Sequence, residues 1–224
     1  MDRAGQGNTD GGLIIARDDA HHYRVADGTG LPHDPLNAIV GPRPIGWISS
    51  LSTDGVANLA PYSFFNAFNY RPPLVGFSSI GWKDTVANVD ATGEFVWNLA
   101  TRSVAGAMNE TSASLPSDED EFVRSGLTPV ASSLVKPPRV LESPVNFECQ
   151  LTQLIQLRNL DDETIPAWLV LGQVVAVHID RELLVDGVYD TAKAHPILRA
   201  GGPADYAEIA PEAMFAMTRP DDRN

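Results

Sequence analysis

Alternation of apolar with polar or small residues between residues 42 and 101 predicts a series of short strands joined by turns. The apolar runs are rich in β-branched and aromatic residues, which favour strands. Asp54 and Gly55 lie between the first two runs and favour a tight hairpin turn. Four strands are predicted in this region, over residues 45–51, 56–59, 74–79 and 94–99.

The same region contains one predicted helix. Residues 86–91 are small or apolar and are followed by Gly93, a residue that commonly ends a helix. Asp84 or Thr85 is expected to cap its start, because both side chains offer an oxygen to the free N–H groups of the first turn. A second helix is expected at residues 104–108, with Ser103 as its N-cap.

Later in the chain, two longer apolar stretches predict a long hairpin. Residues 145–157 alternate well enough for one strand, and residues 167–179 form a nearly continuous apolar strand. The polar residues 159–163 supply the connecting loop. A short helical turn is expected around residues 121–124, ended by Gly126, and a weak edge strand within 183–189.

These elements predict a mainly β protein with peripheral helices. The chain has 224 residues, 43% of them hydrophobic, together with 18 glycines and 17 prolines, which fits one domain of short strands and many turns. We expect a flexible tail over residues 1–20, a barrel domain over 21–215 and a second tail over 216–224.

Charge and cysteine content exclude several classes of function. The formal net charge of −13, without a basic cluster, argues against nucleic acid as a partner. The single cysteine, Cys149, allows neither an internal disulfide nor a thiolate metal cluster, and it favours a reducing compartment.

The adjacent residues His21 and His22 would point to opposite faces of a strand, so no metal site is expected. Without an apolar leader or a membrane-spanning run, a cytoplasmic protein that makes no membrane contact is expected.

One small group of residues is suited to binding a phosphate despite the acidic composition. Lys83, Thr85 and Asn88 bring an ammonium, a hydroxyl and an amide to the predicted start of a helix, where anions are favoured. Asp84 would repel an anion and is assigned to capping. The alternative interpretation is an ordinary capped helix with a solvated lysine.

The motifs PRPIGWISS, NLAPYSFFNA, PPLVGFS, KDT and TGEFVWNL occur in this order along the chain. In this order and spacing they resemble the flavin reductase-like family, and the resemblance covers roughly residues 34–206. It implies a split β-barrel of Greek-key type that binds FMN. It also implies a homodimer with FMN near the subunit interface, and in many members a supply of reduced flavin to a partner monooxygenase.

The resemblance also implies which residues contact the flavin ring. It points to the strand around Trp47 and to the segment that follows the first hairpin, where an exposed strand edge and polar side chains would meet the polar atoms of the ring. The alternatives are a core aromatic for Trp47 and turn stabilisation for Ser63 and Asn66. The ring contacts expected are Trp47, Ile48, Ser49, Ala60, Tyr62, Ser63 and Asn66, with Ser79 as a secondary contact beside Lys83, Thr85 and Asn88.

Three further residues are weaker candidates for the same pocket. His178 lies on a predicted strand and, by the resemblance, can face the flavin or the nicotinamide; a structural histidine is the alternative. Arg199 and Tyr206 flank the pair Gly201 and Gly202, in a region where the family commonly has an arginine, two glycines and a tyrosine.

The chain lacks a P-loop, a Gly-rich dinucleotide fingerprint, an HExxH motif and a nucleophile elbow. This absence fits flavin chemistry, because hydride passes from nicotinamide to flavin without a protein nucleophile. The leading hypothesis is therefore an FMN reductase that uses NADH or NADPH. The alternatives are an electron carrier resembling flavoredoxin and a non-catalytic barrel that binds flavin or haem.

Overall fold

The computed structural model describes residues 19–113, 116, 119–218 and 220. Contacts along the chain divide it into two compact units, Met1–Pro35 and Leu36–Asn224. The described part of the first unit holds one short 3-10 helix, η1 (Val25–Asp27), and a hydrogen bond between His21 Nε2 and the carbonyl oxygen of Thr29 at 2.8 Å. The division falls at Pro35, whereas the sequence led us to expect a domain beginning at residue 21. Most of the expected N-terminal tail, residues 1–18, lies outside the described residues, as do residues 219 and 221–224.

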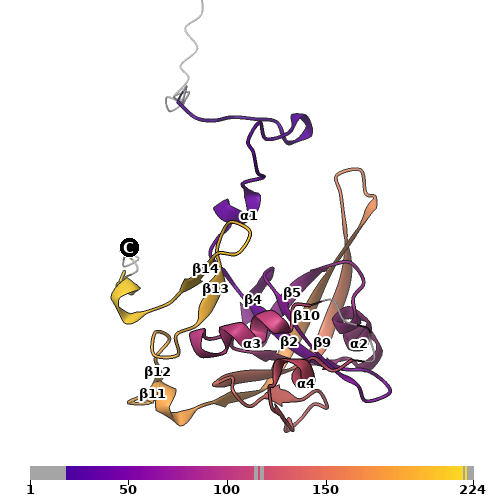
Figure 1. Cartoon of the computed structure of the whole chain (residues 1–224), viewed down its shortest axis with the longest axis vertical. Coiled ribbons are helices and arrows are strands. Elements are labelled where there is room, and N and C mark those ends of the chain that lie inside the picture. Colours follow the sequence, from indigo (N-terminus) through magenta and orange to yellow (C-terminus); the bar gives the residue numbers. More distant parts are fainter. Residues whose placement is uncertain (1–18, 114–115, 117–118, 219, 221–224) are drawn as a thin grey trace, which may run out of the picture. The chain divides into compact units, whose positions relative to one another are not determined.

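A seven-stranded antiparallel sheet forms the centre of the second unit (Figure 1). Its strand order is β3 (Ala57–Tyr62), β2 (Gly46–Leu51), β6 (Glu94–Asn98), β9 (Val145–Arg158), β10 (Thr164–Ile179), β5 (Pro73–Ile80) and β4 (Phe65–Tyr70). The strands predicted at 45–51, 56–59, 74–79, 94–99, 145–157 and 167–179 are all present.

The sheet curls round on itself. Strands β3 and β4 lie at opposite ends of the strand order, yet only Ser63 and Phe64 separate them in the chain. Two residues span only about 7 Å, so the two ends of the sheet must lie close together. Contacts between β3 and β5 confirm that they meet. The expected barrel-like closure follows from this connection.

Three small sheets surround the barrel. Strand β1 (Arg43–Pro44) pairs with β13 (Ile197–Arg199), which pairs with β14 (Tyr206–Glu208), so the C-terminal segment is held beside the start of the barrel. Arg199, one of the weaker site candidates, is the last residue of β13. The other two sheets are β7 (Pro129–Val130) with β8 (Arg139–Val140), and β11 (Leu184–Val185) with β12 (Val188–Tyr189).

The helices are short and peripheral, as predicted. They are α1 (Leu36–Ile39), α2 (Asp84–Thr92), α3 (Ala105–Glu110) and α4 (Glu121–Ser125), with the 3-10 helices η2 (Arg102–Val104), η3 (Arg181–Leu183) and η4 (Pro211–Ala213). None of the helices in the described residues is both long and apolar enough to cross a bilayer.

The predicted helix caps are partly wrong. The N-cap of α2 is Lys83, which makes no side-chain cap, because lysine carries no hydrogen-bond acceptor. Ser103 lies inside η2 and hydrogen-bonds to Thr101 at 2.9 Å instead of capping α3. The helix ends were predicted correctly: Gly93 and Gly126 both take the left-handed conformation after α2 and α4.

Two apolar clusters make up the core. One fills the barrel and includes Ile48, Phe77, Phe95 and Cys149. In the other, Trp47 belongs to a cluster with Met108 of α3, Phe122 of α4 and Ile197 of β13. Cys149 is fully buried, as expected for a structural thiol, and burial raises its pKa.

Gly172 in β10 allows the closest packing in the barrel, and its replacement by alanine is expected to destabilise the fold. A Cβ atom at this position would lie 2.4 Å from Cε1 and 2.5 Å from Cζ of the buried Phe95 ring. Relieving this overlap is expected to lower the free energy of unfolding by about 1–3 kcal/mol in urea denaturation. Gly106→Ala in α3 is the control, because nothing lies within 4 Å of its added Cβ. Equal stability of the two variants would contradict this account of the packing.

Candidate functional site

A cavity of about 250 Å³ lies where the start of α2 meets strand β3 and the ends of α3 and α4. It brings together residues far apart in the sequence, and most of its lining groups are polar. The lining residues are Asn58, Ala60, Pro61, Tyr62, Lys83, Asp84, Thr85, Thr111, Ser112, Ala113 and Glu121.

A network of buried hydrogen bonds fixes the walls of this cavity. Asn58 Nδ2 of β3 donates to Thr85 Oγ1 at 2.8 Å and ties the strand to the helix. Trp47 Nε1 donates to Thr111 Oγ1 at 3.0 Å, which holds the residue after α3 in place. Because these donors and acceptors are buried, breaking one bond would leave its partner unsatisfied, and the wall is therefore rigid.

The start of α2 makes one side of the cavity favourable for an anion. The helix has nine residues, so its first-turn N–H groups lack partners within the helix and carry a partial positive charge. Lys83 precedes this turn, lines the cavity and supplies no cap. Asp84, also at the wall, partly offsets this charge.

The Tyr62 hydroxyl is a buried polar atom without a partner in the described part of the chain. The residue is only 7% exposed and lines the cavity. Burial raises the pKa of Tyr62, and the nearby hydroxyls of Thr85 and Ser79 oppose that shift less strongly. The hydroxyl thus lies behind the surface of the cavity, beside the side-chain hydroxyls of Thr85 and Ser79.

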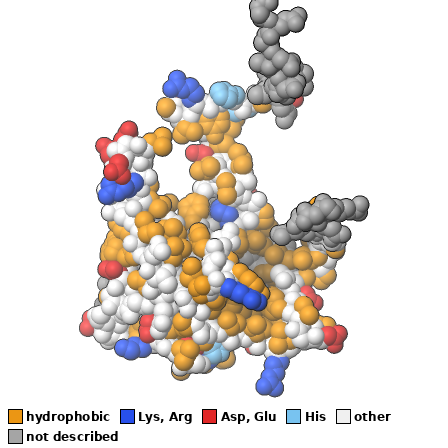
Figure 2. All heavy atoms as spheres, turned by 180° about the vertical axis from the view of Figure 1, so that it is seen from behind, with side chains coloured by type: hydrophobic (Ala, Val, Ile, Leu, Met, Phe, Trp, Pro, Cys, Tyr) orange, Lys and Arg blue, Asp and Glu red, His pale blue; other side chains and the backbone are white. Residues whose placement is uncertain are grey.

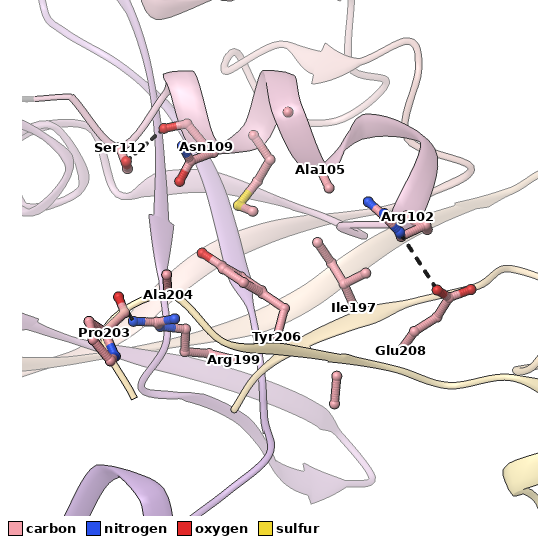
Figure 3. A pocket seen from close by; sticks show the side chains of 13 residues that line it. Arg102, Ala105, Asn109, Ser112, Ile197, Arg199, Pro203, Ala204, Tyr206 and Glu208 are labelled. Atoms are coloured by element: carbon pink, nitrogen blue, oxygen red, sulfur yellow. Dashed lines mark hydrogen bonds and ion pairs between the residues drawn. The ribbon is translucent and has the colours of Figure 1, made fainter. Parts of the chain in front are cut away.

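A larger cavity of about 740 Å³ adjoins the first, and Ser112 lines both. Figure 3 shows its two walls: Ala105, Asn109 and Ser112 on and just after α3, and Arg199 and Tyr206 on β13 and β14. The two cavities therefore meet at Ser112.

Hydrogen bonds hold the second wall. The Arg199 guanidinium donates to the carbonyl oxygens of Gly202, Pro203 and Asp205 at 3.2, 2.8 and 3.0 Å, and it lies 5.1 Å from the centre of the Tyr206 ring. The two weaker sequence candidates thus line a cavity, where Arg199 supports the loop that precedes Tyr206. Arg102 and Glu208 form an ion pair at 3.8 Å at one end of this cavity (Figure 3).

Four of the predicted site residues meet in the smaller cavity. Ala60, Tyr62, Lys83 and Thr85 line it. Lys83 and Thr85 belong to the group predicted from charge and helix position, whereas Ala60 and Tyr62 come from the resemblance.

Trp47, Ile48 and Ser49, which were expected to contact the flavin ring, do not line the smaller cavity. Strand β2 pairs with β3 on one side and with β6 on the other, so it has no exposed edge along these residues. All three residues are completely buried within this chain, so a ligand at its surface cannot contact their side chains. The sequence could not show this, because an apolar strand looks the same at an edge and at the centre of a sheet. Trp47 instead supports the cavity from behind, through Thr111.

Ser79, Ser63 and Asn66 lie outside the smaller cavity. Ser79 is completely buried and donates to the carbonyl oxygen of Gly81 at 2.9 Å. The carbonyl oxygen of Ser63 accepts from Arg43 Nε at 3.1 Å, and Asn66 Oδ1 accepts from the N–H of Ala67 at 2.8 Å. These bonds fit the alternative of turn stabilisation. Asn66 also lines a separate cavity of about 370 Å³.

Asn88 and His178 have structural partners. Asn88 Nδ2 donates to Ser50 Oγ at 3.2 Å, on the sheet beneath α2, and does not line the cavity around Lys83. His178 Nε2 lies 2.6 Å from Oε1 of the fully buried Glu148. His178 lines neither of the two adjoining cavities. Its contact with Glu148 is the contact that a structural histidine would make.

Sequence reasoning missed several lining residues. Thr111 and Ser112 follow a helix at the start of a polar segment, and nothing in their spacing points inward. Glu121 lies in the helical turn expected around residues 121–124 and is only 7% exposed. The one signal was the neighbouring apolar residue Phe122, which anchors α4 in the core.

Comparisons with known proteins agree with this fold. The family model described as flavin reductase-like domain matches residues 41–197. The uncharacterised protein YwrF of Bacillus subtilis is 36% identical over 83% of this chain and 91% of its own length. An uncharacterised protein of Aquifex aeolicus is 36% identical over 73% of this chain and 83% of its own.

Two solved structures extend the comparison. Nitrilotriacetate monooxygenase component B from Bacillus cereus has a TM-score of 0.76 and 30% identity, covering 92% of this chain and all of the other. The 2-nitrobenzoate 2-nitroreductase NbaA of Pseudomonas fluorescens has a TM-score of 0.73 and 28% identity, covering 84% of this chain and 90% of the other.

Proposed function

Because the chain belongs to the flavin reductase-like domain family, we propose that it binds FMN and transfers hydride from NADH or NADPH to the flavin. One observation carries the proposal: Lys83 lines a cavity at the start of α2, where the first-turn N–H groups of the helix lack partners within it. A phosphate would pair with both, because its oxygens accept from ammonium and backbone N–H groups.

In this proposal the FMN phosphate binds at the start of α2. The Lys83 ammonium and the first-turn N–H groups of α2 would donate to the phosphate oxygens. Each charge-assisted hydrogen bond contributes about 1.5–3 kcal/mol, so three of them account for much of a micromolar affinity. Thr85 Oγ1 accepts from Asn58 and so holds the helix start against β3.

The larger cavity would take the flavin ring and the nicotinamide. When bound, FMN supplies a ring that accepts hydride, so this chain needs no nucleophile of its own. The chain's task is to position two rings and to exclude water. Tyr206 and the residues of α3 that face it in Figure 3 would form the walls for these rings.

The reduced FMN formed in this reaction would be supplied to a partner monooxygenase. Support comes from the similarity to a protein named as a monooxygenase component, at 30% identity over nearly the whole chain. An electron carrier that receives electrons from a protein donor is the alternative, and it differs in not reacting with free nicotinamide.

Anaerobic reduction tests the proposed activity. Purified protein loaded with FMN is expected to be yellow and to lose its flavin absorbance when NADH or NADPH is added without oxygen. Persistent absorbance with both nucleotides, followed by bleaching with dithionite, would favour the electron carrier. Protein that retains no flavin under any condition would contradict both.

We also propose that the chain forms a homodimer. Strand β4 is a sheet edge, and it exposes Phe68 (52%) and Tyr70 (80%). At the end of β5, Ile80 and Trp82 are exposed too. Figure 2 shows broad hydrophobic areas with few charged side chains on one face of the molecule. Apolar patches beside an open edge are typical of protein interfaces.

Light scattering tests the dimer. The mass is expected to be about twice the 24.1 kDa of the chain, and Phe68→Asp is expected to lower it toward one chain. A wild-type protein that runs as a single chain at micromolar concentration would contradict the proposal.

A further inference from the structure

Glu121 is a carboxyl group in the same cavity that should hold a phosphate. It is the first residue of α4, is 7% exposed and lines the cavity together with Lys83 and Thr85. Its Oε2 accepts from the backbone N–H of Leu59 on the edge strand β3 at 3.0 Å. This hydrogen bond holds the carboxylate at the wall of the cavity, near the place where an anion would bind.

We propose that binding of the FMN phosphate is coupled to the uptake of one proton by Glu121. The proposal rests on the proposed function, since it concerns the phosphate end of the same site. A carboxylate and a phosphate in one small cavity repel each other, and protonation of the carboxyl removes the repulsion. The protonated group can also donate a hydrogen bond to the anion.

The surroundings of Glu121 favour such coupling. Burial raises its pKa, the hydrogen bond from Leu59 opposes the shift, and the charges of Asp120 and Asp84 raise the pKa further. Strand β3 contributes only the Tyr62 hydroxyl as a titratable group, and α3 carries only Glu110. Lys83 is therefore the one cation among the residues that line the cavity, and a phosphate would compete with Glu121 for it.

The sign of the effect follows from linkage. If binding of the anion raises the pKa of Glu121, FMN binds more tightly at pH values where the carboxyl is protonated. Affinity is then lost as pH rises above the pKa of the free site. The phosphate of FMN titrates in the same range and acts in the opposite direction, so a variant that lacks only the carboxylate is required as reference.

Titration of wild type and Glu121→Gln with FMN between pH 5 and pH 8, followed by flavin fluorescence, tests the proposal. Glutamine keeps the acceptor for Leu59 and cannot ionise. We divide the dissociation constant of the wild type by that of the variant at each pH. This ratio is expected to rise about tenfold from pH 5 to pH 8, because only the wild type gains a negative charge beside the phosphate as the pH rises. Glu110→Gln, an identical change outside the cavity, is expected to behave as wild type.

Calorimetry provides a second readout that does not need the variant to fold. In wild type at pH 7, the FMN phosphate, with a second pKa of about 6, is mostly a dianion already and has little proton to release. The binding enthalpy of FMN measured in buffers of different ionisation heat should then show proton uptake, and riboflavin, which lacks the phosphate, should show none. Parallel pH curves for wild type and Glu121→Gln, or equal proton uptake with FMN and riboflavin, would overturn the inference while leaving FMN binding intact. No FMN binding at any pH would overturn the proposed function as well.

Discussion

Replacing Lys83 by alanine is expected to weaken FMN binding by roughly 10- to 100-fold, because a charge-assisted hydrogen bond contributes about 1.5–3 kcal/mol. Lys83 is the only cation among the residues that line the cavity at the start of α2. Its side chain makes no cap, so its removal should leave the helix intact. Fluorescence titration with FMN gives the dissociation constant directly.

Lys136→Ala is the matched control for this prediction. It removes the same charge from an exposed residue that does not line the cavity, so both variants change the net charge of the protein equally. Both variants therefore change the general repulsion between the acidic protein and an anionic ligand by the same amount, and only the local contact of Lys83 distinguishes them. If the two variants bind FMN equally well, the phosphate is not at α2.

Replacing Glu148 by glutamine should cause a large loss of stability. The carboxylate is completely buried on β9 and accepts from the backbone N–H groups of Ser133, Leu134 and Val135 at 2.7, 2.6 and 3.2 Å. His178 Nε2 lies 2.6 Å from its Oε1. Glutamine has one acceptor oxygen, and its NH₂ group would face donors. Leaving buried donors unpaired is expected to lower the free energy of unfolding by on the order of 3 kcal/mol.

Urea denaturation at pH 7 measures this loss, with Glu142→Gln as control. Glu142 also accepts a backbone N–H, that of Thr128 at 3.1 Å, but it is exposed, so water replaces the lost bond. Its replacement is expected to cost less than about 1 kcal/mol. Similar losses for the two variants would show that the buried bonds contribute no more than exposed ones.

The contribution of Glu148 also depends on pH. Burial by itself would raise its pKa, but the backbone N–H groups and His178 together outweigh that effect and lower the pKa below its ordinary value of 4.5. A lowered folded-state pKa means that the stabilisation is present above about pH 4.5 and is lost as pH falls through the folded value. The difference in unfolding free energy between wild type and Glu148→Gln should therefore shrink below pH 4.5. A difference that stays constant in acid would contradict this assignment.

The strands of the barrel could be predicted because local patterns determine them. The β9–β10 hairpin, for example, follows from two alternating apolar stretches around the polar residues 159–163. The position of a strand within the sheet could not be predicted, because it depends on pairing between distant segments. For this reason β2 was expected to present an edge, although β3 and β6 flank it.

The residues of the candidate site also fall into those that local sequence could predict and those that it could not. Lys83 and Thr85 could be identified because they are neighbours in the sequence at the start of a predicted helix, where free backbone N–H groups favour an anion. Thr111 and Glu121 could not, since only tertiary packing brings the residue after α3 and the first residue of α4 to the same cavity. His178 was ambiguous from sequence alone, and its partner Glu148 is 30 residues away.

The most direct test of the central claim is a comparison of FMN with riboflavin as ligands of the wild-type protein. The two ligands share the ring and differ in the phosphate, so the comparison isolates the donors at α2. FMN is expected to bind with a micromolar or lower dissociation constant, and riboflavin at least about tenfold more weakly, because the phosphate adds charge-assisted hydrogen bonds. Equal affinities for the two, or no binding of FMN, would contradict the account.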